Sequence, residues 1–116
     1  MTTYNWNEIP VEQMNAATTR QVIHAQNLTI ARIGIAKGGI VPTHAHVNEQ
    51  VLNMVSGRLK VILDGKEIVL DGGSTLVIPP NVPHSVEALE AVVAVDVFSP
   101  RREDWLRGDD AYLRQK

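Results

Sequence analysis

Apolar and polar residues alternate in short runs along most of the chain, which is the pattern of half-buried β-strands. Residues 28–36 show this pattern clearly, because Ala31, Ile33 and Ile35 share one face and Arg32 lies on the other. The same reasoning predicts strands at 20–24, 51–55, 58–63, 66–70, 75–78 and 91–98. Short strands this closely spaced predict an all-β fold, an antiparallel β-barrel or jelly roll.

Turn residues separate the predicted strands. Asp64-Gly65 is a pair strongly favoured in two-residue turns, so the strands on either side of it should form a hairpin. Ser56-Gly57 is expected to turn the chain between two further strands. Pro79-Pro80 should end the strand before it, because proline cannot donate a backbone hydrogen bond.

The two ends of the chain differ from its middle. With 116 residues the chain forms one domain, which we divide into an irregular N-terminal arm (1–19), a barrel (20–98) and a C-terminal helical segment (99–116). Ser99 is a suitable N-cap and Pro100 a suitable first helical residue, so a short helix is expected over residues 100–107. Trp105 and Leu106 would form its packing face.

Composition and charge argue against several classes of function. The sequence has no cysteine, so any bound metal must be held by nitrogen and oxygen. A formal net charge of -2, with acidic and basic residues interspersed, argues against nucleic acid as a partner. The N-terminus lacks the pattern of a signal peptide and no apolar run could span a membrane, so we expect a soluble, cytoplasmic protein without a membrane partner.

The candidate chemistry centres on residues 43–50, Thr-His-Ala-His-Val-Asn-Glu-Gln. In an extended strand the alternate side chains of this run point the same way; they are His44, His46, Asn48 and Gln50. Two imidazoles two residues apart can bind one divalent ion, and a third protein ligand from elsewhere would complete a site. Taken alone, the pair can also be two solvated histidines on a loop.

The residues on either side of this histidine pair follow a longer pattern. Residues 38–57 read Gly-x5-His-x-His-x3-Gln-x6-Gly, which resembles the first motif of the cupin family. Residues 73–84 resemble the second cupin motif and end in His84. The resemblance implies a single-domain cupin whose metal ligands are His44, His46, Gln50 and His84.

Both motifs depart from the family pattern. Gln50 stands where a metal-binding Glu is usual, Asn81 replaces a Gly, and Ala88 stands in place of a terminal Asn. The change at position 81 is tolerable, because Asn is the next best residue at positive φ. Glu49 could be the ligand instead of Gln50 if the strand bulged. Alternation from His46 places Gln50 inward and Glu49 outward, so we favour Gln50.

Asp96 interrupts the most apolar strand, 91–98. Burying an ionised carboxylate is costly unless the group is paired or bound. Asp96 is therefore either a buried residue satisfied by an arginine or by backbone donors, or a catalytic group. Phe98 shares its face and Arg102 follows on the first turn of the predicted helix, which favours the catalytic role.

Residues 96–104, Asp-x-Phe-Ser-Pro-x-Arg-Glu-Asp, resemble the small KdgF-type cupins of pectin and alginate degradation, which linearise unsaturated monouronates. The resemblance extends from about Gly38 to Leu113. It implies an isomerase-type enzyme, a uronate substrate and functional roles for Asp96, Phe98 and Arg102. Three imidazoles and one amide are neutral ligands, so the ion keeps its full charge and the acid/base group lies outside the ligand set. Nickel, zinc, manganese and iron all accept such ligands.

Two other functions stay open at this point. One is a non-catalytic cupin that binds a metal and a small acid, which a buried Asp96 would serve poorly. The other is a cupin dioxygenase, against which Gln50 argues mildly. The arm, with Trp6 and Ile9, and the exposed sheet edges predict a homodimer.

Arg32 and His24 are weaker candidates for a site. Arg32, on a strand face, either pairs with a carboxylate or points at an anionic ligand. His24 belongs to neither motif and is treated as an ordinary strand histidine.

Overall fold

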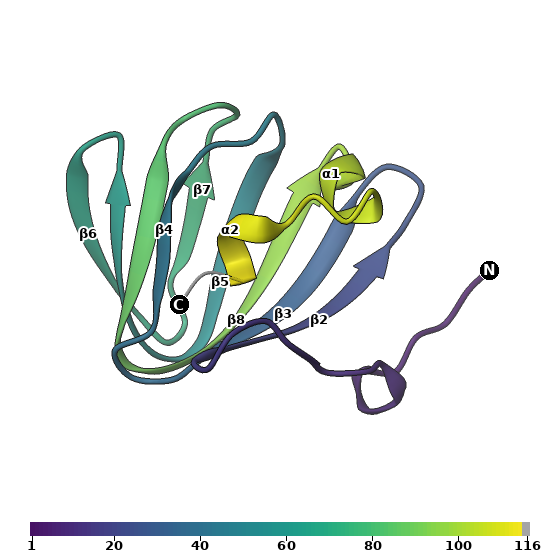
Figure 1. Ribbon diagram of the computed structural model, residues 1–116, viewed down its shortest axis with the longest axis horizontal. Coiled ribbons are helices and arrows are strands. Elements are labelled where there is room, and N and C mark those ends of the chain that lie inside the picture. Colours follow the sequence, from purple (N-terminus) through teal and green to yellow (C-terminus); the bar gives the residue numbers. More distant parts are fainter. Residues whose placement is uncertain (115–116) are drawn as a thin grey trace.

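The strands form one antiparallel sheet that curls into a barrel (Figure 1). The computed structural model describes residues 1–114. Neighbouring strands pair in the order β1-β2-β3-β8-β5-β6, while β4 also pairs with β8 and β7 with β5. The elements are η1 (Trp6–Glu8), β1 (Glu12–Gln13), β2 (Thr18–His24), β3 (Thr29–Ile35), β4 (Ile40–His44), β5 (Glu49–Leu63), β6 (Lys66–Asp71), β7 (Thr75–Ile78), β8 (His84–Ser99), α1 (Glu103–Leu106) and α2 (Ala111–Arg114). The predicted all-β antiparallel architecture is confirmed.

The two longest strands, β5 and β8, pair with each other along most of their length. β8 also pairs with β4 through its first half and with β3 through its second half. The register of β5 against β8 shifts within residues 54–59. Gly57 lies so close to β8 that a Cβ at this position would be 2.0 Å from the backbone oxygen of Ala91, which leaves no room for any other residue. The predicted turn at Ser56-Gly57 is therefore wrong, because this glycine lets β5 bend at a bulge and continue as one strand.

The other predicted strands and turns agree well with the structure. Asp64 and Gly65 have φ values of 50° and 79° and join β5 to β6, as a two-residue hairpin requires. Asn81 has a φ of 64°, so it adopts the conformation expected of the glycine it replaces. β7 ends directly before Pro79-Pro80, and the inward side chains of β3 are buried, namely Ala31, Ile33 and Ile35.

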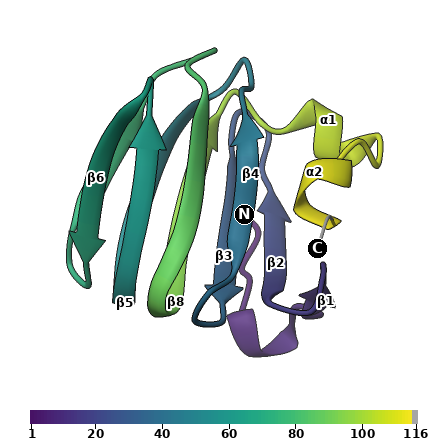
Figure 2. The same ribbon diagram turned by 60° about the vertical axis from the view of Figure 1, so that its left-hand side comes forward.

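The C-terminal segment forms two short helices on one side of the barrel (Figure 2). The helix predicted over 100–107 is present but shorter, because α1 begins after Arg102, which is its N-cap. The predicted N-cap at Ser99 is wrong. Ser99 still pairs with Glu49 in the sheet, which keeps the chain extended at that point. Trp105 is buried as predicted, but Leu106 is 48% exposed and faces solvent. Within residues 1–114 no helix is long and apolar enough to cross a membrane.

The barrel interior is apolar apart from a group of buried polar side chains. Burial of such groups is costly unless they have partners, so their position marks a candidate site. Those that face the interior together are His46, Gln50, His84, Asp96 and Arg102.

Candidate functional site

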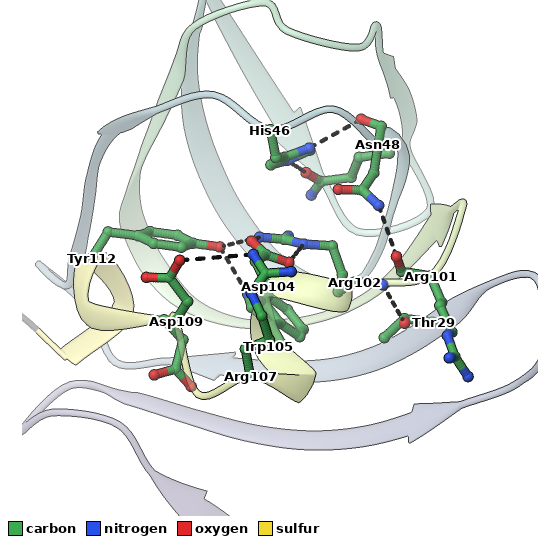
Figure 3. A network of polar contacts seen from close by, with 12 residues as sticks. Thr29, His46, Asn48, Arg101, Arg102, Asp104, Trp105, Arg107, Asp109 and Tyr112 are labelled. Atoms are coloured by element: carbon green, nitrogen blue, oxygen red, sulfur yellow. Dashed lines mark hydrogen bonds and ion pairs between the residues drawn. The ribbon is translucent and has the colours of Figure 1, made fainter.

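The first histidine motif does not fold as one strand. β4 ends at His44 and β5 begins at Glu49. In the loop between them, Nδ2 of Asn48 donates to the backbone oxygens of Pro100, at 2.6 Å, and Arg101, at 3.2 Å (Figure 3). The expectation of a continuous strand is wrong, because this loop is held by hydrogen bonds to the segment after β8.

Strand pairing brings the third imidazole to the first two. His44 pairs with His84 across β4 and β8, and their ring centroids are 4.2 Å apart. The ring of His46 lies 5.0 Å from that of His84 and 5.8 Å from that of His44. One ring nitrogen from each histidine lies within 4.8 Å of the other two. The three rings are thus close enough to bind one metal ion.

Each imidazole is oriented by a hydrogen bond to a nearby backbone carbonyl. The bonds join Nδ1 of His44, His46 and His84 to the oxygens of Pro42, Asn48 and Val82, at 2.8, 3.0 and 2.9 Å. A carbonyl can only accept, so Nδ1 carries the proton and Nε2 keeps a lone pair for a metal. Burial lowers the pKa of all three rings, to about 4 for His44 and His46, so they are neutral at pH 7.

The remaining donor atoms of this cluster fit a divalent cation. Nε2 of His84 is buried and has no hydrogen-bond partner among residues 1–114. Nε2 of His46 lies 3.1 Å from Oε1 of Gln50, so two lone pairs face each other once Nδ1 of His46 carries the proton. A buried polar atom without a partner is destabilising. A metal ion bound by these nitrogen and oxygen atoms would satisfy them together.

Gln50 faces the cluster and Glu49 does not. The side chain of Gln50 is buried, whereas Glu49 is exposed, as alternation along the strand predicts. Gln50 lies directly opposite Phe98 in the pairing of β5 with β8, and Asp96 occupies the inward position just before Phe98 on β8. This register places Asp96 and Phe98 beside the histidine cluster.

Asp96 is buried without a full set of partners. Its Oδ1 has no hydrogen-bond partner in the part of the chain that the structure describes. Burial raises the pKa of Asp96 to about 7, although the Gln50 side chain and the charge of Arg102 act to lower it. A carboxyl group with this pKa is present in both protonated and ionised forms near neutral pH. Among residues 1–114, Asp96 forms no ion pair with an arginine.

Arg102 is almost completely buried, with 1% of its surface exposed. Its Nε and Nη2 donate to the two carboxylate oxygens of Asp104, at 3.0 and 2.8 Å, and Nη2 also donates to Oη of Tyr112, at 2.9 Å (Figure 3). The guanidinium carbon lies 4.7 Å from the ring centre of Phe98 and 4.2 Å from that of Trp105. Arg102 is therefore held in one orientation on the wall of the site.

Tyr112 and Asp104 are site residues that sequence reasoning missed. The Tyr112 ring stacks on His44, with 4.3 Å between centroids and 26° between planes. No motif marks a single tyrosine in a short tail. Asp104 stands two residues after Arg102, and that spacing of opposite charges was the one available signal for it.

The residues of the site line a cavity of about 60 Å³. Its polar lining consists of His44, Gln50, His84, Asp96, Arg102 and Tyr112, and most of the remaining wall is apolar. An apolar cavity with a few convergent polar groups is typical of a small-molecule site.

Arg32 and His24 lie outside this cavity. Arg32 is exposed on the outer face of β3 and borders a groove beside η1, so it is not a residue of this site. A 2.8 Å hydrogen bond joins Nδ1 of His24 and Oγ1 of Thr29, in agreement with the interpretation of His24 as an ordinary strand histidine.

Comparison with known proteins agrees with the motif spacing. The family described as Cupin domain matches residues 31–98. The pectin degradation protein KdgF of Dickeya dadantii (strain 3937) is 30% identical over 103 residues, which cover 86% of this chain and 94% of that protein.

Two solved structures have the same architecture. An RmlC-like cupin from Shewanella frigidimarina NCIMB 400 has a TM-score of 0.83 and 30% identity, with 88% of this chain and 93% of that chain covered. KdgF from Halomonas sp. has a TM-score of 0.84 and 26% identity, with 90% of this chain and 98% of that chain covered. The chain therefore belongs to the cupin family and, within it, to the KdgF-type cupins.

Proposed function

We propose that this protein is a metal-dependent isomerase that converts 4,5-unsaturated monouronates, from pectin or alginate breakdown, to their linear 5-keto-4-deoxy form. Opening of the ring hemiacetal releases an enol at C5, which loses its hydroxyl proton and gains a proton at C4. The atoms balance without a co-reactant. The observation that carries the proposal is the unpartnered carboxyl oxygen of Asp96, buried beside three convergent imidazoles.

The metal ligands in this proposal are His44, His46, Gln50 and His84. The ion is nickel, zinc, manganese or iron, since all of them accept nitrogen and oxygen ligands of this kind. Because these ligands are neutral, a bound ion supplies undiminished positive charge for the oxyanion that develops at C5. A glutamate at position 50 would cancel part of that charge. The neutral ligand set also leaves proton transfer to a residue outside it.

Asp96 is the residue that moves the proton in this mechanism. Its carboxylate accepts the hydroxyl proton of the enol and returns it to C4, a role of general acid and base. Phe98 provides an apolar wall against the sugar. Arg102 carries the positive charge that binds the substrate carboxylate. General acid/base catalysis of this kind is typically worth about 10²–10⁴-fold in rate.

The first test of this function follows the substrate directly. The conjugated alkene of the unsaturated monouronate absorbs in the ultraviolet and the linear product does not. Metal-loaded protein is expected to accelerate the loss of absorbance above the spontaneous rate for a pectin-derived or an alginate-derived substrate. If neither substrate decays faster than it does spontaneously, the proposed isomerase function is wrong.

Two further measurements separate the alternative functions from the proposed one. A non-catalytic cupin would bind galacturonate, measured by calorimetry, without accelerating decay. A cupin dioxygenase would consume oxygen in the presence of substrate, whereas the proposed isomerisation consumes none.

We also propose that the protein is a homodimer. Cross-strand pairing aligns five apolar side chains in one row on the outer face of the sheet, and they are Val77, Val51, Val97, Ile30 and Ile23. Val77 is 53% exposed, and Val55 on the same strand as Val51 is 58% exposed. The N-terminal arm borders the groove beside this face. A second copy would bury these apolar side chains.

Sedimentation tests this assembly. At micromolar concentration the protein is expected to sediment at twice its chain mass of 12.8 kDa. Val97→Lys, in the middle of the row, should shift it to the monomer, because a lysine would be buried in the interface. Val69→Lys is the control, since Val69 is exposed on β6 and lies outside the row. A wild-type monomer at all concentrations would contradict the proposal.

A further inference from the structure

The guanidinium of Arg102 has one nitrogen left for a ligand. Nε and Nη2 are engaged by Asp104 and Tyr112. Nη1 has no hydrogen-bond partner among residues 1–114, and it is not among the fully buried polar atoms without partners. Because Arg102 lines the cavity, Nη1 is the N–H group that a ligand can reach.

The hydroxyl of Tyr112 also has a proton left over. Its Oη lies 2.9 Å from Nη2 of Arg102 and 3.2 Å from Nε1 of Trp105. Both nitrogens can only donate, so the tyrosine oxygen accepts from both. The phenolic proton must therefore find another acceptor, and no acceptor for it occurs among the described residues. Tyr112 lines the same cavity as Arg102.

Contacts of the C-terminal segment with the barrel determine where Tyr112 lies. Nδ2 of Asn15 donates to the backbone oxygen of Leu113 at 2.8 Å, next to Tyr112 in α2. The buried ion pair of Arg20 with Asp110, at 2.9 Å, holds the residue just before α2. The ring is also stacked on His44. Tyr112 is thus supported on both sides, as a residue that binds a ligand in a defined geometry must be.

We propose that Tyr112 is a substrate-binding residue, whose phenolic O–H and the Nη1 of Arg102 form a two-donor subsite for the carboxylate of an acid sugar. The two donors are adjacent, since the hydroxyl accepts a hydrogen bond from Nη2, the other terminal nitrogen of the same guanidinium. The ion pair with Asp104 offsets part of the positive charge of Arg102, so recognition in this subsite depends on directed hydrogen bonds as well as on charge. Asp104 acts through Arg102, because its two carboxylate oxygens hold the guanidinium in place. The inference rests on the proposed function for the identity of the acid.

Tyr112→Phe is the decisive variant, because it removes one oxygen and retains the ring that stacks on His44. Tyr4→Phe is the matched control, since Tyr4 is 55% exposed in the N-terminal arm. D-galacturonate binding is measured by calorimetry, along with the KM and kcat of uronate decay, metal content and the thermal midpoint. Tyr112→Phe should weaken galacturonate binding and raise KM by about tenfold, as loss of a hydrogen bond to a charged group does. The kcat and metal content should stay close to wild type. The thermal midpoint should fall, because Nη2 of Arg102 and Nε1 of Trp105 lose a shared acceptor, so the rise in KM at constant kcat, and not the midpoint, distinguishes ligand binding from a merely structural role.

The methyl ester of galacturonate, used as a second probe, identifies the group that is bound. The acid should lose more affinity than the ester in Tyr112→Phe, and an equal loss would overturn the carboxylate assignment. If Tyr112→Phe binds galacturonate as tightly as Tyr4→Phe, the inference is wrong, whatever the rate of decay. If the wild type binds galacturonate without accelerating decay and Tyr112→Phe binds it more weakly, the inference stands and the isomerase function fails. If the wild type does neither, both fail.

Discussion

The His84→Ala variant is expected to lose nearly all bound metal. His84 is the one proposed ligand on β8, and its Nε2 is buried with no hydrogen-bond partner among residues 1–114. Removal of one ligand from the proposed set of four would leave a bound ion with incomplete coordination. Element analysis of untagged wild-type protein should give about one equivalent of divalent metal per chain, as expected for a single cluster of this kind. His46→Ala should show the same loss.

His24→Ala is the matched control for these variants. His24 lies outside the cluster and is hydrogen-bonded to Thr29, so its loss should leave metal content unchanged. Full metal in both His46→Ala and His84→Ala would remove the basis of the metal centre and of the reaction proposed on it. Loss of metal in His24→Ala as well would indicate unfolding rather than loss of a ligand.

The fold was predictable to the extent that burial is periodic along the sequence. Alternation located β3 and β7, and Asp64-Gly65 located the hairpin of β5 with β6, because these features depend on neighbouring residues alone. The prediction failed at Ser56-Gly57. A Ser-Gly pair resembles a turn locally, but the close backbone of Ala91 and the continuous partner β8 make it a bulge.

The candidate site was predictable where sequence spacing reflects a local geometry. The spacing of the motifs was sufficient to indicate the three histidines that the structure brings within 4.8 Å of one another. It could not show that the loop before Glu49 breaks the strand, because Asn48 is held there by Pro100, 52 residues away. Tyr112 could not be found for the same reason. Its place depends on contacts of Asn15 and Arg20 with the end of the chain.

The Asp96→Asn variant is expected to slow enzymatic decay of the unsaturated uronate by about 10²-fold or more, the usual range for loss of a general acid/base group. Asparagine keeps the shape of the side chain but cannot accept and return the proton. The variant should lower kcat and leave KM nearly unchanged, because the proton is transferred in the transition state and not when the substrate binds. Metal content should stay at the wild-type value, since Asp96 lies outside the proposed ligand set.

The stability of Asp96→Asn separates the two roles that a buried aspartate can have. If Asp96 were a structural carboxylate paired with an arginine, its replacement would leave that arginine unpaired and the thermal midpoint would fall. The Oδ1 of Asp96 has no partner within residues 1–114, and Arg102 is paired with Asp104 instead. A neutral amide should therefore leave the midpoint unchanged or raise it, as is common where a site is kept for function. Asp71→Asn, at an exposed ion pair with Arg58, is the control and should keep full activity. Wild-type turnover by Asp96→Asn would exclude the aspartate from the reaction and leave the proton transfer to another residue of the cavity.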